Sequence, residues 1–144
     1  MRLILLIAII TFAIHTNYSQ QISSPDSKLI LTIKLSENNE LIYNLIREGK
    51  TVVIDSKLGI DLLDQPDLMS GFKIDTVVTS NFTEVWAPVW GEVDSILNNY
   101  HQMVVTLFQP IEKRTMILTF RLFNDGLGFR YEFPVQDSLN YFTV

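Results

Sequence analysis

The fold of this chain is decided by residues 29–46, which read LILTIKLSENNELIYNLI. Apolar side chains alternate with other residues on each side of a polar link at residues 36–40. A period of two is typical of β-strands, because it gathers the apolar side chains on one face. The link contains two Asn residues, which favour turns. The stretch therefore predicts two antiparallel strands joined as a hairpin.

Similar short runs continue to the end of the chain. Further strands are predicted at residues 51–54, 58–63, 72–80, 100–108, 115–123 and 128–133, and residues 140–144 have the pattern of the beginning of another. Gly, Pro, Asn and Asp punctuate the sequence between these runs. After residue 22 no apolar residues recur at helical spacing over a sufficient length. About eight short strands with regular turns predict an all-β fold, an antiparallel β-sandwich.

The composition bounds the class of protein. The chain has 144 residues, 47% of them hydrophobic, which suits one globular domain. It carries 11 Lys and Arg against 16 Asp and Glu, and this acidic balance argues against nucleic acid as a partner. With no cysteine and two histidines, disulfide scaffolds, thiolate metal sites, thiol nucleophiles and His-rich metal sites are excluded. Any metal would have to prefer oxygen ligands.

The first 20 residues have the pattern of an export signal. Arg2 precedes an apolar stretch at residues 3–14, and a polar segment with the small residue Ser19 follows. The stretch is shorter than the roughly 20 residues that span a bilayer, although an uncleaved anchor or a buried core helix would look similar. No cysteine follows, which excludes a lipoprotein anchor. We therefore expect a domain at residues 21–144 that is periplasmic or secreted, without membrane contact after cleavage.

Two tryptophans are candidates for binding. Trp86 and Trp90 lie in a segment that Pro88 and Gly91 interrupt, so we expect a loop or an irregular edge there. Exposed aromatic rings stack on the apolar faces of sugars, and an indole N–H can orient a polar ligand. Large aromatic side chains equally fill the ends of sandwich cores. The burial of the two tryptophans separates these alternatives.

Acidic residues flank the tryptophans. A glycosidase needs two carboxylates held roughly 5 to 9.5 Å apart, and Glu84, Glu92 and Asp94 are the candidates closest in sequence to the aromatic rings. Solvated surface charge explains them equally well. His101 has no recognisable Ser or Asp partner, which favours a surface or half-buried side chain over a catalytic base. The residues therefore assign no catalytic group.

Two features near the C-terminal end have structural explanations. Residues 124–126, Asn-Asp-Gly, predict a tight turn between two strands, and the Asp spacing and closing Glu of a calcium loop are missing. Arg130 and Glu132 share one face of a predicted strand, which indicates an ion pair. Neither feature predicts a ligand site.

Five blocks of the sequence, taken in order, resemble the N-terminal domain of glycoside hydrolase family 97. They are residues 22–28, 58–60, 71–72, 86–92 and 123–134. The resemblance covers essentially the whole chain after the export signal. It implies a galactose-mutarotase-like β-sandwich, often called a super-sandwich. It also implies an exported bacterial enzyme that cleaves α-glucosides with inversion or α-galactosides with retention.

The family resemblance places the catalytic chemistry outside this chain. It implies that a (β/α)₈ barrel supplies the general acid, the base or nucleophile, and most ligands of a calcium ion. The glutamate that the N-terminal domain adds to that calcium site belongs to a motif beyond the position matching Val144. We therefore expect an incomplete sandwich, truncated before the barrel and inactive alone, that helps to wall the active site. An oligosaccharide or α-glycoside would contact Trp86, Trp90 and Glu92, and no metal ligand is expected here.

Two residues depart from the family pattern, and both positions remain compatible with turns. Ser27 stands where the family has Gly, so a positive φ would be less comfortable there. Asn124 stands where the family often has Asp.

Three functions remain open from the sequence. The chain is the docking sandwich of a hydrolase, a free-standing carbohydrate-binding module, or a secreted interaction or structural sandwich without sugar affinity. Exposed tryptophans favour the first two, and buried ones favour the third. A truncated sandwich is also expected to expose inner-face residues such as Leu118, Phe120 and Phe129, and to be poorly soluble alone.

Overall fold

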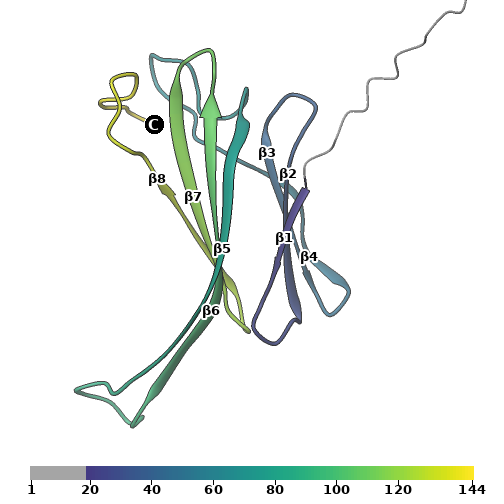
Figure 1. Cartoon of the computed structure of the whole chain (residues 1–144), viewed down its shortest axis with the longest axis vertical. Helices are drawn as coiled ribbons and strands as arrows, with labels where there is room; N and C mark the ends of the chain where they lie inside the picture. Colours follow the sequence, from purple (N-terminus) through teal and green to yellow (C-terminus); the bar gives the residue numbers. More distant parts are fainter. Residues whose placement is uncertain (1–18) are drawn as a thin grey trace, which may run out of the picture.

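The computed structural model describes residues 19–144, which form eight antiparallel strands and no helix. The strands are β1 (Ser19–Ser23), β2 (Leu29–Leu35), β3 (Leu41–Arg47), β4 (Lys50–Leu58), β5 (Lys73–Trp86), β6 (Ile96–Gln109), β7 (Arg114–Leu122) and β8 (Leu127–Glu132). They make two four-stranded sheets, ordered β1-β2-β3-β4 and β5-β6-β7-β8, which face each other (Figure 1). The predicted antiparallel all-β sandwich is confirmed.

The hairpin that residues 29–46 predict is the centre of the first sheet. β2 and β3 pair in register from Leu29↔Arg47 to Leu35↔Leu41. The link closes through backbone hydrogen bonds between Ser36 and Glu40 and between Asn39 and Ser36, and Asn39 takes a φ of 57°. An Asn tolerates that left-handed conformation better than most residues. The polar link therefore determines the register that turns one apolar face inward.

The core lies between the two sheets. Its largest side chains with almost no exposure are Leu31, Ile33, Leu41, Leu68, Phe72, Met103, Leu107, Met116, Leu118, Phe120 and Leu122. The expectation that Leu118 and Phe120 are exposed was wrong, because the facing sheet covers both. Phe129 remains 42% exposed, although its ring packs on Phe120 and Tyr43.

Residues 59–72 differ from the prediction. The strand predicted at residues 58–63 is absent, and the chain makes only an isolated bridge between Ile60 and Leu68. Leu58, Ile60 and Leu62 alternate with other residues as in a strand, but the loop instead folds over the core and buries Leu62 and Leu68. Residues 140–144, also predicted to begin a strand, are irregular. β1 was not predicted.

A buried arginine fixes the loop of residues 59–72. Arg114 is 2% exposed and donates hydrogen bonds to the carbonyl oxygens of Pro66 (2.8 Å) and Asp67 (2.8 Å). Its Nε donates to Gln109 Oε1, and Gln109 Nε2 donates in turn to the carbonyls of Asp67 and Ser70. Because these partners satisfy the guanidinium, its burial is tolerated and the loop is tied to the second sheet.

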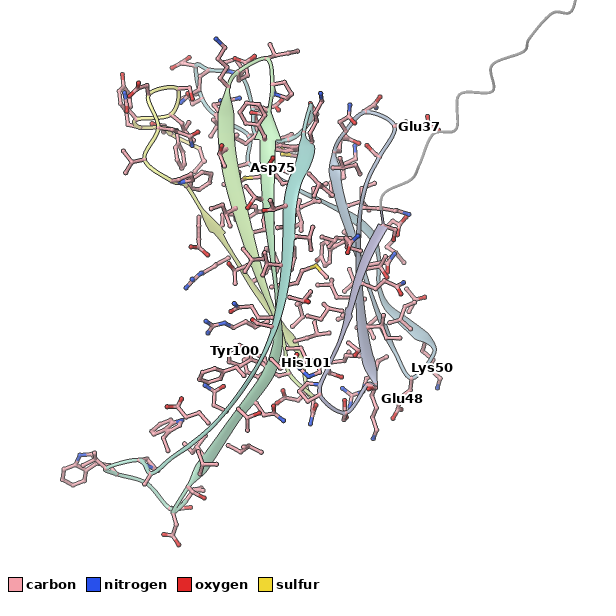
Figure 2. The ribbon with its side chains drawn as sticks, viewed as in Figure 1. Glu37, Glu48, Lys50, Asp75, Tyr100 and His101 are labelled. Carbon is pink, nitrogen blue, oxygen red and sulfur yellow. The ribbon has the colours of Figure 1, made fainter. Side chains whose placement is uncertain are left out.

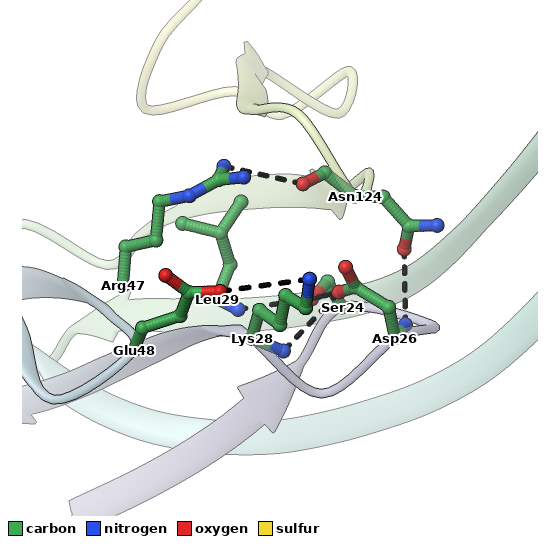
Figure 3. A network of polar contacts seen from close by, with 7 residues as sticks. All are labelled: Ser24, Asp26, Lys28, Leu29, Arg47, Glu48 and Asn124. Atoms are coloured by element: carbon green, nitrogen blue, oxygen red, sulfur yellow. Dashed lines mark hydrogen bonds and ion pairs between the residues drawn. The ribbon is translucent and has the colours of Figure 1, made fainter.

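Two turns close one end of the sandwich (Figure 3). Ser24 Oγ donates to Asp26 Oδ1 at 2.6 Å and accepts from the Leu29 backbone N–H. The Asp26 backbone N–H donates to Asn124 Oδ1 at 3.0 Å, across 98 positions of sequence. Ser27 takes a φ of 60°, the conformation expected to be less comfortable for Ser than for Gly. The opening block and the Asn-Asp-Gly turn therefore meet as a latch between the sheets.

The predicted export signal lies outside the described residues, except that Ser19 and Gln20 begin β1 and pair with β2. In the part of the chain that is described, no helix is long and apolar enough to cross a membrane.

Candidate functional site

The longest hairpin extends well beyond the sandwich. β5 and β6 pair from Lys73↔Phe108 to Trp86↔Ile96, whereas β6 pairs with β7 only from His101 to Gln109. Residues 82–100, which we call the arm, therefore continue as a two-stranded ribbon and loop, away from both sheets (Figure 1). The rest of residues 19–144 is called the body. Both strands continue past the bounds predicted for them, and Pro88 and Gly91 lie in the loop at the tip.

The predicted binding residues all lie on the arm. Trp86 ends β5, whereas Trp90 and Glu92 lie in the tip loop, so the segment expected to be a loop is strand in its first part. Trp90 is 89% exposed and Trp86 is 46% exposed. The two tryptophans therefore do not fill the sandwich core.

The acidic residues flanking the tryptophans are exposed as well. Glu84, Glu92 and Asp94 lie on the arm and take part in none of the four ion pairs found in residues 19–144. None of the three lines the pocket at residues 63–65 and 137–143 or the pocket beside Arg121. The structure therefore places these carboxylates at the surface.

The base of the arm is held on both sides by contacts that no pattern in the sequence predicted. On one side, the Tyr100 ring stacks on Phe82 at 4.9 Å and packs on Phe123 at 5.2 Å, with the Arg121 guanidinium 4.6 Å from its centre. On the other side, His101 Nδ1 lies 2.7 Å from the Ser23 carbonyl oxygen of β1. Figure 2 shows Tyr100 and His101 where the hairpin leaves the body. His101 is half-buried, as predicted.

We call the side chains of Phe82, Tyr100, Arg121 and Phe123 at the base of the arm the base cluster. No short sequence pattern predicts this cluster. Phe82 and Tyr100 become partners only through the β5–β6 register, and Phe123 and Arg121 reach them from β7 and the turn after it. Met103 is buried in the core and lies three positions after Tyr100 on β6. Because side chains alternate between the two faces of a strand, Tyr100 points to the outer face of the second sheet, and the base cluster packs on that face.

The pockets of the body lie away from both tryptophans. One of about 480 Å³ lies between residues 63–65 and 137–143. Another of about 270 Å³ lies beside the base cluster, lined by Arg121, Phe123 and Phe129 among others. Neither assembles a recognisable catalytic set of side chains.

The predicted Arg130–Glu132 ion pair is confirmed, with Nε and Oε1 2.9 Å apart. Glu132 also accepts a hydrogen bond from the Thr119 hydroxyl at 2.6 Å. That hydroxyl first, and then Arg130, hold the pKa of Glu132 below its ordinary value. The ion pair lies within β8 at the surface, and the hydrogen bond from Thr119 connects it to β7.

Calcium, which the family resemblance implies for a complete enzyme, does not fit the residues described. Across residues 19–144, no group of three or more His, Asp or Glu side chains could hold a metal ion.

Comparison with known proteins gives the family. Residues 22–144 match the family described as Glycosyl-hydrolase 97 N-terminal. The chain belongs to glycoside hydrolase family 97. A family 97 enzyme from Pseudoalteromonas sp. strain K8, solved in complex with panose, matches 83% of this chain with a TM-score of 0.77 and 29% sequence identity. Its structure with acarbose matches with the same values.

This family 97 chain spans 18% of the length of the Pseudoalteromonas enzyme. A β-arabinopyranosidase matches 82% of this chain, and 18% of its own, with a TM-score of 0.73. At 20% identity, that likeness shows the fold alone. The predicted relationship to the N-terminal domain of family 97 is thus confirmed.

Proposed function

We propose that this chain is the N-terminal sandwich of an exported family 97 glycoside hydrolase, an α-glucosidase or α-galactosidase. In this proposal the sandwich docks through its arm on a catalytic (β/α)₈ barrel and brings Trp86, Trp90 and Glu92 to the wall of the substrate pocket. The barrel performs hydrolysis and holds most of the calcium ligands. The sandwich alone is inactive.

The exposed apolar arm is the observation that carries this proposal. Val85, Val89, Trp90, Val93 and Leu97 are each between 59% and 89% exposed on a ribbon that stands clear of the body. Contiguous exposed apolar surface is typical of a binding site for another protein or a ligand. Membership of family 97 supports a catalytic domain as that partner.

A binding titration tests docking. The partner is the Pseudoalteromonas family 97 enzyme from which the segment matched by this chain has been deleted, and the readout is calorimetry. Saturable binding is expected, followed by hydrolysis of panose at a rate that the deleted enzyme alone does not reach. Trp90→Ala should lower that rate. A partner that is folded by circular dichroism and yet does not bind would contradict the proposal.

Free-standing sugar binding is the second candidate, because two exposed tryptophans favour it as well. Both tryptophans of the chain lie on the arm, so its tryptophan emission reports on the arm alone. We expect red, quenchable emission that panose alone leaves unchanged. A saturable change of emission with panose, lost in Trp90→Ala, would favour the free-standing module.

Export is a separate part of the proposal, supported by the pattern of residues 1–20. Expression of the chain in a bacterium, followed by fractionation and N-terminal sequencing, tests it. A mature terminus near Gln20 or Gln21 in the periplasmic fraction is the expected result, and a cytoplasmic chain beginning at Met1 would contradict export.

A further inference from the structure

The arm presents apolar side chains on both of its faces. Val85 and Leu97 lie directly opposite each other in the β5–β6 register, and Trp86 and Ile96 form the next pair. Because side chains alternate along a strand, the two pairs point to opposite faces of the ribbon. All four are exposed, by 38% to 64%. A ribbon lying flat on a partner needs one apolar face, so two such faces indicate contact on both sides.

The body of the chain covers neither pair. The aromatic contacts at the base end with Phe82 and Tyr100, and within residues 19–144 neither tryptophan belongs to an aromatic pair. An isolated two-stranded ribbon is at best marginally stable in water. A partner that covers both faces would supply the packing that the body lacks.

The charge of the arm indicates the chemistry of its partner. Residues 82–100 contain Glu84, Glu92 and Asp94 and no Lys, Arg or His, and all three carboxylates are exposed. Protein interfaces place opposite charges across from each other. Nucleic acid and anionic lipid would be repelled by this segment.

We infer that the arm inserts into a cleft of a protein partner, between two apolar walls and beside a rim of Lys or Arg side chains. The inference rests on the proposed function, in which the partner is the catalytic part of a family 97 enzyme. It adds that the arm is a two-sided wedge: the pairs Val85–Leu97 and Trp86–Ile96 contact the partner on the two faces of the ribbon, and the tip with Trp90 and Glu92 reaches the substrate pocket.

Face-specific variants of the chain test insertion. Val85→Lys with Leu97→Glu makes one face polar, and Trp86→Lys with Ile96→Glu makes the other face polar. Opposite charges across each pair favour the hairpin register. Val52→Lys on β4 is the matched control, since Val52 is 58% exposed but lies on the body. Each variant is titrated by calorimetry into the deleted Pseudoalteromonas enzyme.

Insertion predicts that each double variant raises Kd by at least about tenfold, as loss of buried interface anchors does, and that Val52→Lys leaves it unchanged. Binding that survives either double variant overturns insertion but leaves docking intact. No binding by the original chain contradicts the proposed function itself. If a double variant loses its β-sheet circular dichroism, the single substitutions Leu97→Ser and Ile96→Ser test the same two faces.

A charge variant and a lipid control complete the test. Glu92→Gln with Asp94→Asn should weaken binding at low salt and reduce its salt dependence, because it removes two of the three carboxylates facing the cationic rim. If binding of the original chain and of this variant depends equally on salt, the proposed rim of Lys or Arg side chains is contradicted. Vesicles of phosphatidylcholine should not bind the chain. If the original chain binds these vesicles and both double variants do not, the arm binds a lipid surface, and insertion into a protein cleft is contradicted.

Discussion

The body and the arm contain the same kinds of residue in the same secondary structure, yet their apolar side chains have opposite environments. In the body, Leu31, Met103 and Leu118 are fully buried between two sheets. On the arm, Val85 and Leu97 are exposed because no second sheet reaches them. Residues that favour strands therefore form strands in both regions, but their apolar side chains are buried only in the body. The body therefore contains the buried core that stabilises the chain, whereas the arm leaves apolar side chains exposed.

The largest difference should appear between Phe120→Ala and Trp90→Ala. Phe120 is 1% exposed and packs on Phe129, so its truncation leaves a cavity and should cost about 3–5 kcal/mol of unfolding free energy. Trp90 is 89% exposed, and its truncation should change that free energy by less than about 0.5 kcal/mol. Urea denaturation followed by far-ultraviolet circular dichroism measures both. Similar losses of unfolding free energy for the two variants would contradict the distinction between a stabilising body and an exposed arm.

Gly59→Ala should reduce stability within the body by about 1–3 kcal/mol, as overpacking does. A Cβ at Gly59 would lie 2.5 Å from the Leu68 carbonyl oxygen and 2.9 Å from Met69 Cα, which are both backbone atoms. Gly126→Ala is the matched control, since a Cβ there meets nothing within 4 Å and the residue does not have a positive φ. Thermal unfolding measures both variants. Equal melting temperatures for the two variants would mean that the backbone at Leu68 and Met69 can move away from the added Cβ at little cost in free energy.

Local sequence patterns predict part of the body, and contacts between distant residues decide the rest. Local alternation determines β2, β3, β7 and β8, and the Asn-rich link determines the first turn. Residues 58–63 also alternate, but they fold over the core instead of pairing, and that outcome depends on Arg114 far along the chain. Contacts between distant residues such as Asp26 and Asn124 leave no local pattern.

The structural position of the candidate binding residues was predicted in part from the sequence. Trp86, Trp90 and Glu92 were expected on an irregular segment, and the alternatives for the tryptophans were exposure or packing. The length of the arm was not predicted. Pro88 and Gly91 indicate that the segment around them is not a regular strand, but they do not indicate that β5 continues to Trp86 or that β6 begins at Ile96. The base cluster was missed because its members meet only through the β5–β6 and β6–β7 registers.

Tyr100→Leu tests the boundary between the two regions. Tyr100 loses two aromatic contacts and the Arg121 guanidinium, which should cost about 1–2 kcal/mol. Hydrogen exchange of residues 82–99 should increase while exchange in the first sheet stays the same, because the arm loses its attachment. Tyr43→Leu, which removes an aromatic contact inside the body, is the control and should leave exchange of the arm unchanged. Faster exchange of the arm in both variants would place the boundary elsewhere.

The smallest effect is a pH dependence of the body at its latch. The Ser24 hydroxyl first, and then the Lys28 backbone N–H and the nearby cations, hold the pKa of Asp26 below its ordinary value. Because the pKa is lower in the folded state than in the unfolded state, the ionised carboxylate stabilises the fold above about pH 4. That contribution is lost as the pH falls through the lower folded pKa.

Asp26→Asn should therefore be less stable than the original chain at pH 7, and the difference should shrink as the pH falls below about 4. Urea midpoints measured from pH 7 to pH 2 give the comparison. Asp125→Asn removes one negative charge from the same end of the sandwich and controls for net charge alone. If both variants follow the same pH dependence, the hydrogen bonds of Asp26 do not carry the effect, and the latch stabilises the body through Asn124 and the backbone instead.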